Sequence, residues 1–140
     1  MREILFRGKR IDNGEWVYGN LNILNGCIYH IVPLQVYIHT SGIPVSEFYD
    51  VDPSTVGQYT GLTDKNGKKI FEGDICRFDN DEPDESERYT NYAVQWDCVN
   101  CRYVVVDAYN REDCLDIFFA KHAEVIGNVH DNPELLEVGE

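Results

Sequence analysis

The sequence predicts a mainly β domain: a small antiparallel, partly closed barrel of the SH3-like kind, built from hairpins with one or two short helical turns. Two observations predict it. Asn-Gly, the dipeptide that favours the positive φ angles of tight hairpin turns, occurs three times between strand-like runs, at residues 13–14, 25–26 and 66–67. The apolar runs are short and rich in β-branched and aromatic residues, which favours strands. Closing such a sheet would remove its exposed edges.

The length and composition predict one domain over residues 1–140, since 140 residues with 43% hydrophobic side chains are typical of a single globular unit. Residues 1–40 are expected to form an N-terminal meander of three or four strands. Residues 58–130 are expected to supply the central and C-terminal strands of the barrel. Between them we expect a loop with one helical turn, because Asp52 precedes Pro53 in the order typical of a helix start.

Side-chain alternation places the strands of the second half. Ile75 is expected on one face of a strand, with Cys76 and Phe78 on the other. Alternating aromatic and apolar residues over 92–96 predict the next strand. The β-branched run at 103–106 predicts a strand that is buried on both faces.

The C-terminal part has one ambiguous segment. Residues 112–120 fit either a short helix, capped near Asn110 or Asp113, or a strand. Residues 124–129 predict a final strand, and residues 133–136 one helical turn that begins at a proline.

The net charge of −13 is unevenly distributed along the chain. Residues 1–70 carry seven acidic and seven basic side chains, whereas residues 71–140 carry 18 and five. Residues 79–88 alone hold six acids and one base, which predicts a mobile loop between two strands. Phosphate backbones require the opposite charge, so a nucleic-acid partner is disfavoured. A protein that imitates nucleic acid with its carboxylates is an alternative.

Targeting signals are not apparent in this sequence. The first residues contain no apolar stretch of signal-peptide length, and no run approaches the ~20 residues of a membrane-spanning helix, so we expect no membrane partner. The five cysteines are irregularly spaced, which favours reduced thiols in a cytoplasm over a disulfide framework.

Two segments go beyond general β patterning: VDPSTVGQYTGLTDKNGKKIFEGDI at 51–75 and EVIGNVHDNPELL at 124–136. With the opening REILFR, they resemble the YopX family of phage and prophage proteins, in the same order along the chain. The resemblance implies a mainly β fold and a phage, prophage or mobile-element origin, hence the cytoplasm of a bacterial host cell. It implies no catalytic residue, because the family has no established function. The acidic 79–88 loop and the Cys98 and Cys101 pair depart from the family pattern.

The residues in the matched segments are mostly turn formers. We expect glycines at turns or bulges and polar side chains that accept local backbone N–H bonds: Gly61, Gly67, Gly73, Asp74, Asn128 and Asn132. A motif of this composition is expected to encode a fold more often than a site.

Cys98 and Cys101 form the sharpest candidate for a chemical site. A CxxC on a turn can present two thiolates to one zinc ion, but a structural zinc needs four ligands. The residues that could complete such a site show no recognisable spacing: Cys27, Cys76, Cys114, His122 and His130. Two reduced thiols near a β-turn are the favoured interpretation, a thiol- or zinc-dependent site is the alternative, and a Cys114–His122 dyad is a further one.

The function that we favour is that of a small, acidic, non-enzymatic accessory protein that binds a host or phage protein. The sequence shows no phosphate-binding loop, nucleophile elbow or dinucleotide fingerprint, so no catalytic residue or cofactor is predicted. Strand aromatics at Trp16, Tyr18, Tyr92 and Trp96 are expected mainly in the core, with a base-stacking platform or a protein interface as alternatives. A homo-oligomeric structural role is another alternative.

Overall fold

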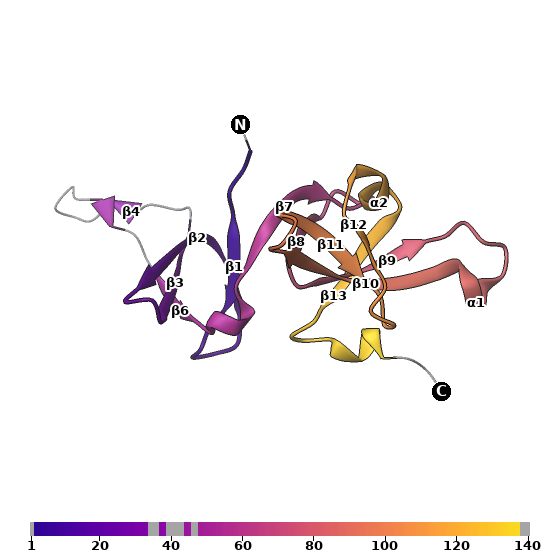
Figure 1. Ribbon diagram of the computed structural model, residues 1–140. Helices are drawn as coiled ribbons and strands as arrows, with labels where there is room; N and C mark the ends of the chain where they lie inside the picture. The colour runs from indigo at the N-terminus through magenta and orange to yellow at the C-terminus, as the bar shows by residue number, and fades with distance from the viewer. Residues whose placement is uncertain (1, 34–36, 39–43, 46–47, 138–140) are drawn as a thin grey trace. The chain divides into compact units, whose positions relative to one another are not determined.

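The computed structural model describes residues 2–33, 37–38, 44–45 and 48–137. About half of the described residues lie in strands of antiparallel sheets, and the helices are short (Figure 1). The mainly β prediction is therefore confirmed. The sheets are not closed, so the barrel is not confirmed. The chain forms two compact units, Met1–Tyr59 and Thr60–Glu140.

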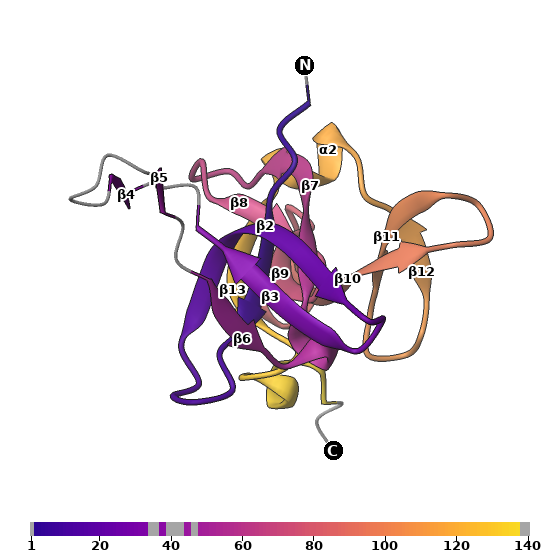
Figure 2. The same cartoon turned by 90° about the vertical axis from the view of Figure 1, so that its left-hand side faces the viewer.

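The first unit is built on a meander of three strands. Strand β6 lies beside β3, so the order is β6-β3-β2-β1, and the start of β7 pairs with β1. Figure 2 shows β2, β3 and β6 side by side. Strand β6 lies between the two regions that were expected to form strands, in the segment expected to be a loop. The strands are β1 (Phe6–Lys9), β2 (Trp16–Leu24), β3 (Ile28–Val32), β6 (Tyr49–Val51) and β7 (Gly57–Thr63), with a separate pair β4 (Tyr37–Ile38) and β5 (Pro44–Val45).

Local turn chemistry in this unit follows the prediction. The β1–β2 connection has Gly14 at φ +73°, and the β2–β3 turn has Asn25 and Gly26 at φ +53° and +71°. These are the positive angles that Asn-Gly tolerates. The 3-10 helix η1 (Pro53–Thr55) begins after Asp52, whose carboxylate accepts a hydrogen bond from the Ser54 N–H at 3.0 Å.

The core of the first unit lies around Ile31 and Val51, which are fully buried. Gly8 is required beside them, since a Cβ there would come within 2.9 Å of the Val51 side chain. One isolated bridge, Arg10 to Val51, ties the end of β1 to β6. An isolated bridge does not make β1 and β6 a hydrogen-bonded strand pair, so the sheet is not closed.

The second unit contains a five-stranded antiparallel sheet in the order β12-β11-β10-β9-β13. The third predicted hairpin joins β7 to β8, with Gly67 at φ +82°. The strands that begin in this unit are β8 (Lys69–Phe71), β9 (Asp74–Asp79), β10 (Tyr89–Asp97), β11 (Arg102–Val106), β12 (Glu112–Cys114) and β13 (Ala123–Asn128).

Both faces of this sheet carry buried residues. Cys76 and Val94 contribute to one cluster, which is covered by Phe119 and Ala120 of helix α2 (Ile117–Lys121). Ile75, on the opposite face, is also fully buried. Val104 and Val105, neighbours on opposite faces of β11, are also buried. The predicted alternation in β9 and the strand buried on both faces at 103–106 are therefore confirmed.

The ambiguous segment 112–120 is both strand and helix. β12 pairs with β11, and the Leu115 N–H still donates to the Tyr103 carbonyl at 3.2 Å, so the chain stays in the sheet up to that residue. The helix can only begin afterwards, and its cap is Asp116, whose carboxylate accepts the Phe119 N–H at 2.9 Å. The predicted caps at Asn110 and Asp113 are wrong for this reason.

Two further short helices complete the unit. The acidic segment 79–88, expected as a loop, contains α1 (Glu85–Arg88), which is capped by Asp84. The predicted C-terminal turn is η2 (Pro133–Leu136). Among the described residues, no helix has the length and apolar character needed to cross a bilayer.

Candidate functional site

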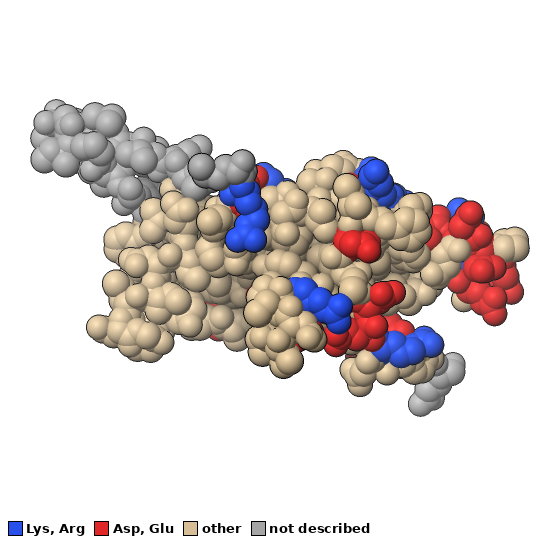
Figure 3. Space-filling model, turned by 45° about the horizontal axis from the view of Figure 1, so that its top comes forward, with Lys and Arg blue, Asp and Glu red and all other residues tan. Residues whose placement is uncertain are grey.

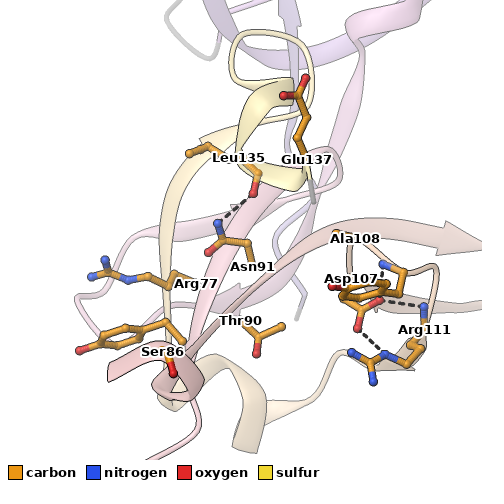
Figure 4. A pocket seen from close by; sticks show the side chains of 11 residues that line it. Arg77, Ser86, Thr90, Asn91, Asp107, Ala108, Arg111, Leu135 and Glu137 are labelled. Atoms are coloured by element: carbon orange, nitrogen blue, oxygen red, sulfur yellow. Dashed lines mark hydrogen bonds and ion pairs between the residues drawn. The ribbon is translucent and has the colours of Figure 1, made fainter. Parts of the chain in front are cut away.

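A groove of about 590 Å³ lies in the second unit, between α1 and β10, the loop from β11 to β12, and η2 (Figure 4). Its lining is polar and aromatic. The residues that give it its chemistry are two arginines, two tyrosines, an asparagine and an aspartate: Arg77, Arg111, Tyr89, Tyr109, Asn91 and Asp107.

Arg77 stands at one side of the groove, and two contacts hold its side chain. Its guanidinium carbon lies 4.5 Å from the centre of the Tyr89 ring, and its Nη2 donates to Glu124 Oε2 at 3.2 Å. The side chain remains 41% exposed. A cation held over a ring and against a carboxylate loses little conformational freedom when a ligand arrives.

The opposite side is a tight loop organised by Asp107. Its Oδ1 accepts the backbone N–H groups of Tyr109 and Arg111, each at 2.9 Å, and its Oδ2 accepts Arg111 Nε at 2.8 Å. Desolvation alone would raise the pKa of Asp107, but the hydrogen bonds from Arg111 and Tyr109 outweigh it and lower this pKa. The loop is therefore fixed around a charged carboxylate.

This loop presents an arginine and a tyrosine to the groove. The Arg111 side chain is 74% exposed and lies 5.2 Å from the centre of the Tyr109 ring. Within the described part of the chain, its Nε is bonded to Asp107, which leaves the two terminal nitrogens for a ligand. The Tyr109 ring is 65% exposed.

The remaining polar groups of the groove serve the fold. Asn91 Nδ2 donates to the Leu135 carbonyl at 2.9 Å and so ties η2 to β10 (Figure 4). Ser86 Oγ donates to Asp84, and Thr90 Oγ1 accepts from Asn80. Neither hydroxyl faces a histidine among the lining residues.

The predicted thiol pair lies elsewhere in the same unit, in the turn that joins β10 to β11. Cys98 and Cys101 are both exposed, and Cys101 Sγ lies 3.8 Å from the Cys98 carbonyl oxygen. No group of three or more His, Cys, Asp or Glu side chains is arranged to hold a metal ion in the described ranges.

The other candidate thiols and imidazoles have separate partners. Burial raises the pKa of Cys76, which belongs to the core. Cys114 Sγ accepts Arg102 Nη1 at 2.9 Å, while His122 Nδ1 lies 2.8 Å from the Phe118 carbonyl oxygen. The structure therefore engages both members of the Cys114–His122 dyad in other contacts.

The strand aromatics divide between packing and exposure. Tyr92 packs against the core of the second unit, with its ring 5.4 Å from that of Phe119 and edge-on to it. Trp96 packs at 4.9 Å against Tyr103 but keeps 46% of its surface exposed. In the first unit, the Arg7 guanidinium lies 4.8 Å from the centre of the Trp16 ring.

Most aspartates of the second unit accept hydrogen bonds from the nearby backbone. Figure 3 shows acidic side chains gathered around α1. Many aspartates bind backbone N–H groups of their own chain, which is a structural use of the negative charge. They are Asp64, Asp74, Asp79, Asp84, Asp97, Asp107, Asp113 and Asp116.

The groove residues were not singled out from the sequence. Arg77 and Asn91 are cross-strand partners, so they meet only through the β9–β10 register. One pattern in the sequence could have indicated part of the groove. Asp107 precedes Tyr109 and Arg111 by two and four residues, a spacing at which an aspartate can accept their backbone N–H groups and shape a loop.

A sequence profile of the YopX protein family matches residues 5–137. The match covers nearly the whole chain, so this protein belongs to the YopX family. The crystal structure of protein EF1440 from Enterococcus faecalis is similar, with a TM-score of 0.59 and 27% sequence identity over 98% of this chain and 100% of that chain. Among the curated proteins, none matches.

The segments that carry the family resemblance hold the fold. Asp74 Oδ2 accepts the Phe71 N–H at 2.7 Å, and Asn128 Oδ1 accepts the His130 N–H at 3.0 Å, as the sequence predicted. Gly127 lies at a β-bulge, where a Cβ would come within 2.5 Å of Asn132 Oδ1. These positions are structural, so they do not identify a functional site.

Proposed function

We propose that this YopX protein is a non-enzymatic accessory protein of a phage or prophage, and that it binds a host or phage protein in the groove of its second unit. The observation that carries the proposal is the pairing of Arg77 with Tyr89 and of Arg111 with Tyr109 along the two sides of that groove. Family membership supports the phage or prophage origin.

Arginine and tyrosine are the residue types that most often dominate binding energy at protein interfaces. Here both arginines are already held by a carboxylate and a ring. Ordering such side chains costs little on association, so contacts to them contribute more fully to affinity.

The arginines also define the chemistry of the partner. A guanidinium edge forms paired hydrogen bonds with a carboxylate, and the Arg111 side chain is 74% exposed in the groove. The partner segment that fits is therefore a peptide with an Asp, a Glu or a free C-terminal carboxylate beside apolar groups that pack on the tyrosine rings.

The test is affinity capture from bacterial lysate, with and without phage induction, using the whole chain as bait. The Tyr89→Ala/Tyr109→Ala double variant removes the rings but leaves the Arg77–Glu124 and Arg111–Asp107 bonds in place. Trp96→Ala is the matched control, because it removes a similarly exposed aromatic from β10 outside the groove.

The proposal expects a protein that is captured by the wild-type chain and by the control but lost with the double variant. It also expects the dissociation constant of the purified pair to rise at least about tenfold in the double variant, since interface hot spots contribute 2 kcal/mol or more. Equal capture by all three baits, or no captured protein, would contradict it.

The imitation of nucleic acid is not proposed, because eight aspartates of the second unit bind their own backbone N–H groups. Seven of them lie at turns, loops, strand ends or helix starts, and Asp113 lies within β12. A phosphate-like array would instead need carboxylates at regular intervals over one face.

A further inference from the structure

We propose that Cys98 and Cys101 form a dithiol–disulfide pair, a redox-sensitive site that reacts with low-molecular-weight disulfides. The site lies in the turn between β10 and β11 and is separate from the groove residues. The inference therefore goes beyond the binding function and does not depend on it.

The hairpin register brings the two cysteines together. Asp97 and Arg102 are the last cross-strand pair, so Cys98 and Cys101 are the first and last residues of a four-residue loop. Cross-strand partners have Cα atoms about 4.5 to 5.5 Å apart. A disulfide spans Cα separations of about 4.4 to 6.8 Å, so the positions next to this pair are suited to one.

The loop is held in shape by the carboxylate that precedes it. Asp97 Oδ1 accepts the N–H groups of Val99 and Asn100 at 3.1 and 3.3 Å, and Asp97 Oδ2 accepts Asn100 Nδ2 at 2.8 Å. Cys101 Sγ lies 3.8 Å from the Cys98 carbonyl oxygen, which places this sulfur against the backbone of the other cysteine.

The backbone conformation of Cys101 gives an independent reason to assign a role to its thiol. Nine residues in the described ranges have positive φ, and all except Cys101 are Gly, Asn or Asp, the residues that tolerate this conformation. Cys101 has φ +53°. Cysteine is poorly suited to a positive φ, and the other residues at such positions are suited to it. The presence of a cysteine here therefore points to a role for its thiol.

A dithiol is favoured over a metal site because it needs only two residues. Structural zinc requires four ligands, and the described residues offer no cluster of three. Cys114, another exposed thiol of this unit, is hydrogen-bonded to Arg102. Cys76 is buried and serves as an unreactive internal reference.

The reaction is a balanced thiol–disulfide exchange. One cysteine thiolate attacks a sulfur of an external disulfide, forms a mixed disulfide and releases one thiolate. The second cysteine then attacks the protein sulfur of the mixed disulfide, forms the Cys98–Cys101 bond and releases the second thiolate. The protein loses two electrons and two protons, and the external disulfide is reduced to two thiols.

The experiment uses the full chain and oxidised glutathione as the probe, in redox buffers of graded composition. After acid quenching and alkylation of free thiols, peptide mass spectrometry locates the disulfides. We expect one intramolecular Cys98–Cys101 bond, formed at lower oxidant than any modification of Cys27 or Cys114. The Cys27→Ser/Cys114→Ser variant should respond as the wild type does.

The single variants Cys98→Ser and Cys101→Ser test the two-step exchange. Each should stop at a glutathione adduct on the remaining cysteine, while the wild type shows no persistent adduct there. The proposal is overturned if the wild type pairs Cys114 with either cysteine, or if both thiols stay free under conditions that modify Cys27. Stoichiometric binding of added zinc to the reduced pair, in preference to exchange, would overturn it as well.

Discussion

Asp64 shows how single carboxylates organise the second unit. Its Oδ1 accepts the N–H groups of Asn66 and Lys68, each at 2.9 Å, and its Oδ2 accepts the Val125 N–H at 2.9 Å. One buried side chain therefore shapes the β7–β8 turn and joins it to β13. A charged acceptor strengthens such bonds, and burial makes their loss expensive.

Asp64→Ala is expected to reduce the free energy of unfolding by about 2 to 4 kcal/mol, because it leaves a buried backbone N–H at Val125 without its partner. Urea unfolding followed by circular dichroism measures the loss. Asp113→Ala is the control, since Asp113 is exposed and, within the described ranges, accepts a hydrogen bond only from the N–H of the next residue. It should change stability by less than about 0.5 kcal/mol, and equal losses in the two variants would refute this account of Asp64.

Cys101→Asn is expected to stabilise the reduced protein by up to about 1 kcal/mol, because asparagine tolerates the left-handed conformation better than cysteine does. Cys101→Ala should bring no such gain. Thermal unfolding under reducing conditions compares the three chains. A gain with alanine equal to that with asparagine would show that the backbone conformation is not the cause.

At the scale of elements, α2 is too short to be stable by itself, since isolated helices need about 12 residues or more. Its packing keeps it in place. Phe119 is 7% exposed, with its ring 5.0 Å from that of Phe78, whereas its neighbour Phe118 is 65% exposed. Two adjacent phenylalanines thus have very different environments.

Phe119→Ala is expected to cost about 3 to 5 kcal/mol of stability, the usual range for removing a buried aromatic ring. Phe118→Ala, the matched control on the same helix, should cost less than about 1 kcal/mol. The denaturant midpoints of the two variants, compared with that of the wild type, measure these losses. Similar losses would mean that α2 does not pack through Phe119.

The elements that could be predicted are those set by local sequence. Asn25 and Gly26 determine their own hairpin turn, and Asp52 with Pro53 determines a helical turn, because these residues act on the adjacent backbone. Strand β6 was missed because its three residues are a strand only through pairing with β3. The groove was missed for the same reason, since Arg77 and Asn91 become neighbours only in the folded sheet.

At the scale of the whole molecule, the net charge of −13 and the aspartate caps act on stability in opposite directions as pH falls. Protonating carboxylates relieves general repulsion. Hydrogen bonds and ion pairs lower the pKa of Asp79, Asp84 and Asp97, through Arg88, Ser86 and Asn100 respectively, and that of Asp107 is also lowered. Groups with a lowered folded-state pKa stabilise the fold above their ordinary value of 3.8 and lose that contribution as pH falls through the lowered pKa.

At high salt, where long-range repulsion is screened, the urea midpoint is therefore expected to fall as pH is lowered from about 5 to 3. Burial raises the pKa of Glu72, which has the opposite effect, whereas the pKa is lowered at five carboxylates, these four and Asp12. Asp107→Asn should make the decline shallower. A midpoint that stays constant or rises over this range would contradict the structural role of the carboxylates.

The central claim is that this YopX protein acts by binding another protein in the groove between Tyr89 and Tyr109. Site-specific photocrosslinking in cells that carry the phage or prophage tests it most directly, with the photoreactive residue p-benzoylphenylalanine at position 109 and, as the control, at position 96. The account predicts a discrete crosslinked protein from Tyr109→p-benzoylphenylalanine that the Trp96 substitution does not give. Crosslinking from position 96 alone, or from neither position, would contradict it.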